Sequence, residues 1–493
     1  MGKKVIRIGL LGVGTVGTGV VRLLTEHREE LERKAGAKLE LARVAEKDTK
    51  RALEAGVPKE VLTDDAYNVI RDGSIDLVVE LIGGINPAKL FVLEAIKSGK
   101  HVVTANKALL AHAWDEILMA ARQRGVEVYF EASVGGGIPI IQSLSEGLAA
   151  NRIQSIFGIV NGTTKYILTL MDKDGKTFAE ALKEAQKLGY AEANPTLDVS
   201  GGDAAHKLVI LSSLAFEASV PLDQVYTEGI EALTPQDLVY AREEFGYVIK
   251  LLAIAKAAEG QIEVRVHPVL IPETHLLADV EGAYNGIYVV GDWVGATMYY
   301  GLGAGQMPTA SAVVSDILYL ARSIAYDVAG RAGWGPFGDI EHAPAKLPIR
   351  PIADITCRYY LRLDCADQPG VFAAIAKILG DHGVSIAALA QKERSKGNKV
   401  PVVILTYEAK EKDMQDALHQ IEALPAVGKR NLLIRVERGH CAVAHVERCR
   451  EPHAASGDGV LARGDQRDDL LGGERQVRIR HVRRDDPVRL WRA

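Results

Sequence analysis

The chain has 493 residues, which is too long for one hydrophobic core and suggests about three domains. Hydrophobic residues make up 47% and charged residues 25%, as in ordinary globular proteins, and the net charge of -5 gives no basic footprint for nucleic acid or an anionic membrane. No apolar run approaches the ~20 residues that cross a bilayer, and no signal-peptide cleavage site follows the N-terminus, so we expect a cytoplasmic protein with small-molecule partners.

The N-terminal segment is typical of a dinucleotide-binding fold. An apolar run at residues 5–11 precedes the glycine sequence GVGTVG, and an amphipathic segment follows it. A glycine turn between strand and helix binds a pyrophosphate because backbone N–H groups at the helix N-terminus face the ligand. Further strands predicted at 39–46, 75–84, 100–106 and 126–133 alternate with helical segments, which indicates a Rossmann-type doubly wound parallel sheet of the α/β class. We expect cofactor contacts from Gly12, Val13, Gly14, Thr15, Val16 and Gly17.

The residues that end the second predicted strand do not distinguish NAD from NADP. Glu46 or Asp48 could bind a ribose hydroxyl, whereas Arg43 or Lys47 could bind a 2′-phosphate. Both cofactors therefore stay open. Further candidate cofactor contacts end the next two strands, at Gly83 and Thr104.

Lys107 follows the predicted strand at 100–106, at the carboxyl edge of the sheet. Ligands bind at this edge in open α/β folds. The alternative is a solvated lysine at the start of a helix, which is what most lysines are. Position alone makes the two interpretations about equally good.

The pattern changes after residue 133 to a mixture of helices and strands. Helices are predicted at 178–189 and at 243–260, the second rich in lysine and alanine, and strands at 262–271 and 286–292. A second glycine turn at 301–305 then leads into a helix that could return to cover the nucleotide-binding domain. We expect an α+β substrate domain from residue 134 to about residue 302.

The stretch 188–207, LGYAEANPTLDVSGGDAAHK, is the most informative in the chain. Asp203 and Lys207 are four residues apart in a predicted helix and would share one face. A surface salt bridge is the alternative, but Gly201 and Gly202 leave room for close approach, and the nearby acidic residues suit a substrate with an ammonium group. If Lys107 points into the same cleft, a second ammonium would lower an amine pKa from about 10.4 toward a useful acid/base range.

Other chemistries fit the sequence poorly. All four cysteines lie in the last third of the chain, in no zinc or redox motif, so the first 356 residues supply no thiol nucleophile. No Tyr-x-x-x-Lys pair and no H-E-x-x-H motif occurs. His206 is expected to face away from the cleft that Lys207 faces.

The C-terminal third contains a small domain and a tail. The proline-marked stretch at 342–353 is a predicted linker, and the strands and helices predicted after it spell βαββαβ over 354–437. Residues 438–493 are rich in arginine, lack lysine and show almost no apolar periodicity. A disordered or out-of-frame tail is favoured over an arginine-rich binding tail.

Together these motifs resemble homoserine dehydrogenases with a C-terminal ACT regulatory domain, over about residues 3–437. The most specific stretches are GLLGVGTVG, TANKALLA, EASVGGGIPII, GIVNGTTKYIL, the 188–211 segment and GLGAGQMPTASAVVSD. The resemblance implies NAD(P)-dependent interconversion of L-homoserine and L-aspartate 4-semialdehyde, in threonine and methionine biosynthesis. The implied domains are an NAD(P)-binding domain at 1–133 completed by about 303–341, a substrate-binding and dimerisation domain at 134–302, the linker, the ACT domain and the tail.

The resemblance also implies residue roles. Lys207 would donate the proton to the aldehyde oxygen, Lys107 would assist at the nicotinamide and the substrate, and Asp203 would hold the substrate ammonium together with Glu192. Gly162 and Thr163 would line the cleft, and Gly305 would close on cofactor and substrate. A monovalent cation, Na⁺ or K⁺, would be bound by Glu131 and the carbonyls of Val134, Gly136 and Ile138.

The segment Asp367–Val371 resembles the strand-to-helix turn of ACT domains, which pair across subunits and bind amino acids. It implies feedback inhibition by threonine and a homodimer or homotetramer; an ACT domain kept only for dimer contact is the alternative. Two other functions remain open: a catalytically silent, nucleotide-responsive amino-acid sensor, and a dehydrogenase for another amino-acid aldehyde. The intact set of candidate site residues disfavours the sensor, because a sensor needs no proton donor.

Overall fold

The computed structural model describes residues 4–329, 347–391 and 399–437. No helix in these ranges is both long and apolar enough to span a lipid bilayer. The predicted tail at 438–493, and the parts of the predicted segments that fall at 330–346, lie outside the described residues.

The N-terminal part forms a six-stranded parallel sheet in the order β3-β2-β1-β4-β5-β6. This order, with strands added on both sides of β1, confirms the predicted Rossmann-type sheet. The strands are β1 (Val5–Leu11), β2 (Lys38–Ala45), β3 (Leu62–Thr63), β4 (Leu77–Glu80), β5 (His101–Thr104) and β6 (Val128–Tyr129). The helices between them are α1 (Thr15–Glu26), α2 (Arg28–Ala35), α3 (Thr49–Glu54), α4 (Ala66–Ile70), α5 (Ala88–Lys97) and α6 (Lys107–Arg124).

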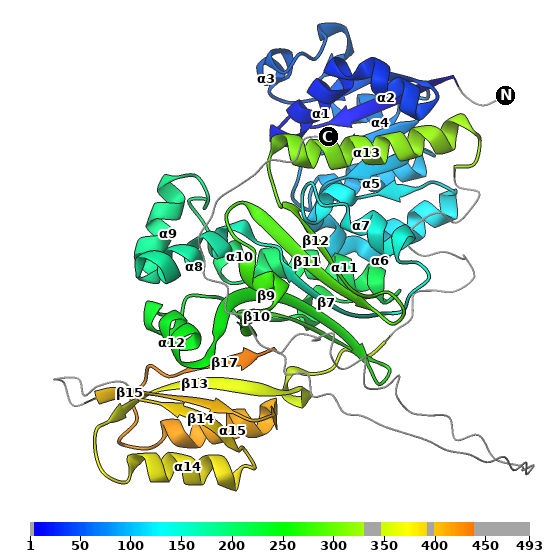
Figure 1. Ribbon diagram of the computed structural model, residues 1–493. Coiled ribbons are helices and arrows are strands. Elements are labelled where there is room, and N and C mark those ends of the chain that lie inside the picture. Colours follow the sequence, from blue (N-terminus) through cyan, green and yellow to red (C-terminus); the bar gives the residue numbers. More distant parts are fainter. Residues whose placement is uncertain (1–3, 330–346, 392–398, 438–493) are drawn as a thin grey trace, which may run out of the picture. The chain divides into compact units, whose positions relative to one another are not determined.

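A helix from much later in the chain also packs on this sheet. Helix α13 (Gln306–Ala325) lies across α1, as Figure 1 shows, and Val313 and Ile317 share an apolar cluster with Val20 and Val21 of α1. The segment that follows the second glycine turn therefore returns to the nucleotide-binding sheet.

The second sheet has eleven strands: nine follow the order β12-β11-β7-β9-β10-β17-β13-β15-β14, and β8 and β16 pair with β10 and β13 beside this path. Its first part comes from β7 (Ile153–Ile159), β8 (Tyr226–Thr227), β9 (Tyr247–Ala258), β10 (Gln261–Pro272), β11 (Tyr284–Gly291) and β12 (Gly295–Leu302). Six helices accompany these strands: α7 (Ile140–Gln142), α8 (Gly162–Asp174), α9 (Phe178–Lys187), α10 (Thr196–Val199), α11 (Gly202–Ala215) and α12 (Pro235–Phe245). Helix α11 packs on β9 and β10 and is buried on every side from residue 203 to residue 214.

The C-terminal elements have the βαββαβ order expected of an ACT domain, with the two-residue strand β16 added before the second helix. Its elements are β13 (Thr356–Ala366), α14 (Val371–Asp381), β14 (Ile386–Ala390), β15 (Lys399–Thr406), β16 (Ala409–Lys410), α15 (Glu411–Glu422) and β17 (Leu432–Val436). Strand β17 runs parallel to β10, with Arg435 opposite Val269 and Val436 opposite Leu270. The strands of the ACT domain therefore continue the sheet that is formed by β7 and β9–β12.

The predicted helix at 243–260 is wrong. Residues up to Phe245 end helix α12, and residues 247–258 form strand β9. Leu252 and Ile254 enter one apolar cluster, whereas Leu251 and Ala253 enter another, because successive side chains of a strand point to opposite faces. Both faces of this central strand are covered, so its sequence is apolar throughout and hydrophobic periodicity does not separate it from a buried helix.

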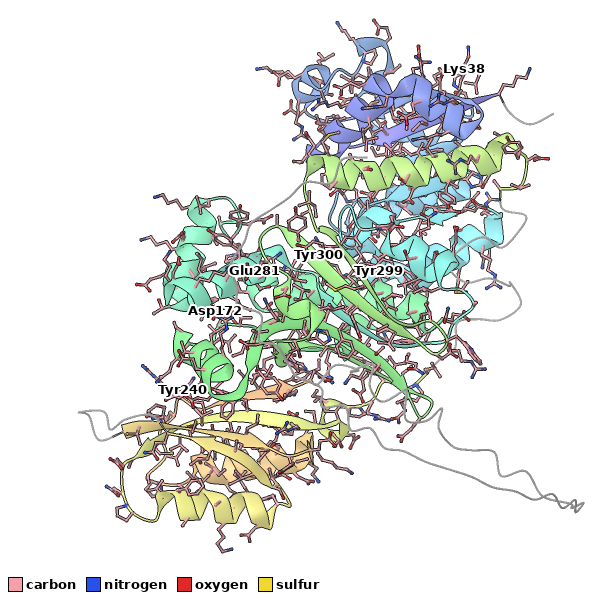
Figure 2. All side chains as sticks on the ribbon, viewed as in Figure 1. Lys38, Asp172, Tyr240, Glu281, Tyr299 and Tyr300 are labelled. Carbon is pink, nitrogen blue, oxygen red and sulfur yellow. The ribbon has the colours of Figure 1, made fainter. Side chains whose placement is uncertain are left out.

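A second junction, between helix α12 and the ACT domain, is ionic. The carboxylate of Asp237 in α12 is completely buried and accepts hydrogen bonds from Tyr360 Oη at 3.0 Å and from Arg362 Nε at 2.5 Å, both in β13. Tyr240 of the same helix, labelled in Figure 2, is also buried. The ACT domain is thus held through α12 as well as through the sheet.

Candidate active site

Lys207 and Asp203 form a buried ion pair on helix α11. Lys207 Nζ donates to Asp203 Oδ2 at 2.7 Å and to the carbonyl oxygen of Val160 at 2.5 Å, and its side chain is only 11% exposed. Gly201 starts the helix in the left-handed region, with φ at +89°, and the following residues form the turn that carries Asp203. The i, i+4 spacing thus brings the acid and the amine together as expected.

Lys107 reaches the same carboxylate from the nucleotide-binding sheet. It is the first residue of α6, where the side chain of Asn106 caps the helix by accepting a hydrogen bond from Leu109 N. Lys107 Nζ lies 2.9 Å from Asp203 Oδ1, and its side chain is 39% exposed. One carboxylate is therefore shared by two ammonium groups, one from helix α6, which follows β5 of the parallel sheet, and one from helix α11.

The environment changes the proton affinity of these groups. Burial lowers the pKa of the Lys207 ammonium, and the charge of Lys107 lowers it further, although Asp203 opposes both effects. Burial alone would raise the pKa of Asp203, but the two ammonium groups hold it well below its usual range. Asp203 therefore stays ionised while the Lys207 amine is made easier to deprotonate.

Three residues extend this cluster. Asn161, which caps α8, donates through Nδ2 to Asp203 Oδ2 at 2.8 Å and to Asp198 Oδ1 at 2.6 Å. Thr163 Oγ1 lies 3.1 Å from Asp198 Oδ2 and 2.8 Å from the carbonyl oxygen of Tyr190, so its one hydroxyl hydrogen serves these two acceptors. Gly162 lies between Asn161 and Thr163 as the first residue of α8. A second carboxylate, Asp198, therefore lies one amide away from Asp203.

Glu192 is not drawn into the cluster by the described contacts. Its side chain is exposed, and the hydrogen bond recorded at this residue runs from Gln186 Nε2 to its backbone carbonyl at 3.1 Å. The sequence pointed to the acidic residues around Lys207, but it did not show that Asp198, rather than Glu192, hydrogen-bonds with the same asparagine as Asp203.

The glycine turn leaves the N-terminus of α1 open. Gly12 has φ at +95°, and a Cβ added there would lie 2.9 Å from the carbonyl oxygen of Leu81, so a side chain is excluded. At Gly14, the N-cap of α1, an added Cβ would meet no atom within 4 Å, and no side chain caps the helix. The first N–H groups of this helix therefore face space that a phosphate can fill.

The acidic residues after β2 already have protein partners. Glu46 Oε2 accepts a hydrogen bond from Val13 N at 2.6 Å and lies 2.9 Å from the Arg51 guanidinium, whereas Asp48 caps α3. Burial would raise the pKa of Glu46, but the hydrogen bonds from backbone N–H groups and Arg51 hold it below its ordinary value.

Of the two basic candidates for a 2′-phosphate contact, one already has a protein partner and the other is exposed. Arg43 Nε donates to Asp72 Oδ2 at 2.8 Å, and Lys47 is exposed. These contacts do not by themselves select NAD or NADP.

A buried glutamate shapes the sheet edge between the glycine turn and Lys107. Glu80 at the end of β4 accepts hydrogen bonds from Ile82 N, from Gly83 N and from Thr104 Oγ1, the last at 2.6 Å. Thr104 is itself completely buried. In the described structure Thr104 therefore supports the turn at Gly83 from behind, a function that its sequence position did not reveal.

The loop at 131–138 contains another buried acid. Glu131 Oε1 and Oε2 accept hydrogen bonds from Ile141 N at 2.9 Å and Gln142 N at 2.8 Å, and its own N–H donates to buried Asp316 of α13 at 2.9 Å. Burial raises the pKa of Glu131 to about 7 and raises that of Asp316 well above its usual value.

The second glycine turn meets this loop. Gly305 starts helix α13, and Gly137 N donates to the carbonyl oxygen of Leu302 at 3.0 Å. Gly305, the loop at 131–138 and the returning helix therefore belong to one neighbourhood. Within the part of the chain that is described, no group of three or more His, Cys, Asp or Glu side chains is arranged to hold a metal ion.

Comparison with protein families covers most of the chain with three models. Residues 12–131 match the NAD-binding domain of homoserine dehydrogenase, residues 139–318 match the homoserine dehydrogenase model, and residues 359–426 match the ACT domain.

Similar proteins extend over nearly the same length. Homoserine dehydrogenase of Neisseria gonorrhoeae is 46% identical over 440 residues, covering 89% of this chain and 100% of the relative, and that of Pseudomonas aeruginosa is 45% identical, covering 88% and 99%. A crystal structure of a homoserine dehydrogenase from Thiobacillus denitrificans matches with a TM-score of 0.84 and 48% identity, covering 89% and 99%. A hyperthermophilic archaeal homoserine dehydrogenase in complex with NADPH matches with a TM-score of 0.54 and 26% identity, covering 64% and 97%.

Proposed function

The chain belongs to the homoserine dehydrogenase family and is an oxidoreductase with a nicotinamide cofactor, and we propose that it interconverts L-homoserine and L-aspartate 4-semialdehyde in threonine and methionine biosynthesis. The observation that carries this proposal is the carboxylate of Asp203, held between Lys107 and Lys207 at the carboxyl edge of the nucleotide-binding sheet. Hydride transfer to or from a carbinol carbon needs a group that moves the hydroxyl proton.

Lys207 is the proposed general acid and base. When bound, the nicotinamide ring supplies the two-electron chemistry by accepting or returning a hydride at the carbinol carbon. In homoserine oxidation the neutral Lys207 amine takes the hydroxyl proton as the hydride leaves carbon. In the reverse direction the ammonium returns that proton to the oxygen, which would otherwise carry alkoxide charge.

The hydrogen bonds of Lys207 leave one position around Nζ for the substrate. An ammonium group has three N–H donors. Two of them are held by Asp203 and by the carbonyl of Val160. The third is left for the substrate oxygen, so the proton would pass between Nζ and the substrate through this one N–H position.

Lys107 and the carboxylates are proposed to bind the substrate. Lys107 would contact substrate and nicotinamide, because its side chain is the more exposed of the two lysines and comes from the nucleotide-binding sheet. Glu192 and Asp203 would hold the substrate ammonium, and we add Asp198 because it shares Asn161 with Asp203. Gly162 and Thr163 would line the same cleft.

The proposed cofactor site combines the open N-terminus of α1 with the neighbouring sheet edge. The pyrophosphate would bind at residues 12–17, where no side chain caps the helix. Either NAD or NADP would fit this part of the site. The remaining proposed contacts are Arg43, Lys47, Gly83, Lys107 and Gly305, whereas the expected contact at Thr104 becomes an indirect one through the turn at Gly83, because its hydroxyl is buried against Glu80.

An assay of the purified protein tests this function directly. With L-homoserine and either NAD or NADP, the reduced cofactor should form, and its absorbance should rise with time. Lys207→Ala should lower kcat by about 10²–10⁴-fold, because that is the usual contribution of a positioned acid or base, and should leave the nucleotide Kd unchanged. Lys173→Ala, which removes an exposed lysine paired with Glu281, is the control and should behave as wild type. Near-normal turnover of Lys207→Ala would reassign the proton donor.

The pH dependence tests the coupling between the two lysines. Homoserine oxidation needs the neutral Lys207 amine, so kcat/KM should rise with pH through the pKa of Lys207, below the ordinary lysine value of 10.5. Lys107→Met removes a cation that lowers this pKa, so the midpoint of the rise should move to higher pH. An unchanged midpoint, measured for homoserine oxidation in both proteins, would show that Lys107 does not act on the catalytic amine.

A monovalent cation is proposed at the loop formed by residues 131–138. Glu131 is 5% exposed and has no salt bridge among the described residues, and the glycine-rich loop supplies backbone carbonyls, the oxygen ligands that hard cations prefer. The residues present therefore fit such an ion. Glu131 and the carbonyls of Val134, Gly136 and Ile138 would hold it, and it would offset the buried negative charge.

Thermal stability should report this cation. A carboxyl whose pKa is raised to about 7 in the folded protein loses stabilisation as pH rises from the unfolded value near 4.5 through 7, because the buried group ionises. At pH 8, Na⁺ or K⁺ should therefore raise the Tm more than tetramethylammonium at equal ionic strength, whereas at pH 5 the salts should differ little. Glu131→Gln should abolish the difference at pH 8. Equal Tm values in all three salts at pH 8 would exclude the site.

Feedback by threonine is proposed through the ACT domain. Adding L-threonine should lower homoserine oxidation by the wild-type protein in a saturable manner, with D-threonine as the control at the same concentrations. Pairing of ACT domains between copies would give a homodimer or homotetramer. Steady activity throughout the L-threonine titration would leave the ACT domain with a structural function only.

A further inference from the structure

Strand β17 of the ACT domain places a buried arginine against the catalytic part of the chain. Arg435 is 2% exposed, and its Nε donates to Glu411 Oε2 at 2.8 Å at the start of α15. Its Nη1 donates to Glu228 Oε2 at 2.9 Å, and its guanidinium lies 4.9 Å from the ring centre of Tyr226. Arg435 is thus held within its own domain by Glu411, and its guanidinium also contacts Glu228 and Tyr226 of the segment 226–230.

The segment 226–230 is held closely at both ends. Tyr226 pairs with Arg265 of β10, and Glu228 N donates to the carbonyl of Val266 at 2.8 Å. Tyr226 Oη also donates to Glu228 Oε2 at 3.0 Å, the oxygen that Arg435 binds. The orientation of the Glu228 side chain is therefore set by two groups, one of which belongs to the ACT domain.

The same segment supports the turn that carries the catalytic residues. Ile230 N donates to the carbonyl of Val199 at 3.0 Å. A Cβ added to Gly229 would lie 2.5 Å from that oxygen and 2.9 Å from Ser200 Cα, so backbone packs directly on backbone here. Val199 follows Asp198, and the turn that continues through Ser200 leads into α11 and Asp203.

We propose that Arg435 is a positioning residue of the active site. Through Glu228 and the segment 226–230 it fixes the turn between Asp198 and Asp203, and hence the carboxylates around Lys207. The active site is then completed by a residue of the ACT domain that touches neither substrate nor cofactor. The inference rests on the proposed function because it takes Asp203 and Lys207 as catalytic.

Two variants break this contact in different ways. Arg435→Met removes the guanidinium but leaves Glu411, which is 2% exposed, without its partner, so loss of stability is expected as well. Glu228→Gln keeps the buried pair of Arg435 and Glu411 and changes only a side chain that is 34% exposed. Glu228→Gln therefore keeps the inference testable if Arg435→Met does not fold.

Arg362→Met is the matched control. Arg362 is also a buried arginine of the ACT sheet that pairs with a carboxylate of the substrate domain, Asp237. Its partner helix α12 contacts α8 through the ion pair of Arg242 with Asp172, near the end of α8 opposite to Asn161. Loss of this arginine weakens the junction between the domains without releasing the turn at residues 199–201.

Steady-state kinetics of the full-length protein test the inference. Arg435→Met and Glu228→Gln should each lower kcat/KM for L-homoserine about tenfold, mainly through KM, with the nucleotide Kd unchanged, and Arg435→Lys should recover part of the loss. The double variant should be no worse than the poorer single variant, because both act through one contact. Arg362→Met should stay within about twofold of wild type.

The outcomes separate the two proposals. Wild-type protein without homoserine activity would overturn the proposed function. Active wild type with folded Arg435→Met and Glu228→Gln variants of unchanged KM would overturn the inference alone. Equal losses in Arg362→Met would also overturn it, because any weakening of the domain junction would then have the same effect.

Discussion

The carboxylate of Asp203 is the constraint on which the rest of the site depends. Two ammonium groups cannot lie close together in a mostly buried place unless an anion separates them, and Asp203 is that anion. Lys107 comes from the edge of the parallel sheet and Lys207 from a helix buried beneath the second sheet. The ion triad of Lys107, Asp203 and Lys207 therefore joins the nucleotide-binding part to the second sheet, at the place where the proposed function brings cofactor and substrate together.

The surrounding polar contacts fix the positions of the segments that carry these three side chains. Asn161 bridges Asp198 and Asp203, so the start of α8 and the turn before α11 share one amide. On the nucleotide side, Glu80 accepts the hydroxyl of Thr104 and the backbone of the neighbouring turn. Each of these buried polar groups is satisfied by a partner on another element, and this explains why a site built from several distant segments can be rigid.

The sequence predicted the parts of the molecule that depend on local spacing. The glycine turn, the parallel sheet, the βαββαβ unit and the shared helix face of Asp203 and Lys207 all follow from residues close together in the chain. Strand β9 was missed because both of its faces are buried and its apolar pattern has no period. The bridge from Asn161 to Asp198 and the contact of Arg435 with Glu228 join residues 37 and 207 positions apart, and no local pattern encodes such pairs.

The continuity of the second sheet affects how this chain can be divided. Strand β17 covers the edge of β10, and Glu437 just beyond it neutralises Lys256 and Arg265 of the neighbouring strands. An excised catalytic fragment ending after α13 would expose an unpaired strand edge and leave two cations without their carboxylate. Such an edge is a template for association with other chains. Evolutionary loss or exchange of the ACT domain in this architecture therefore requires compensating changes on β9 and β10 as well as an earlier end of the chain.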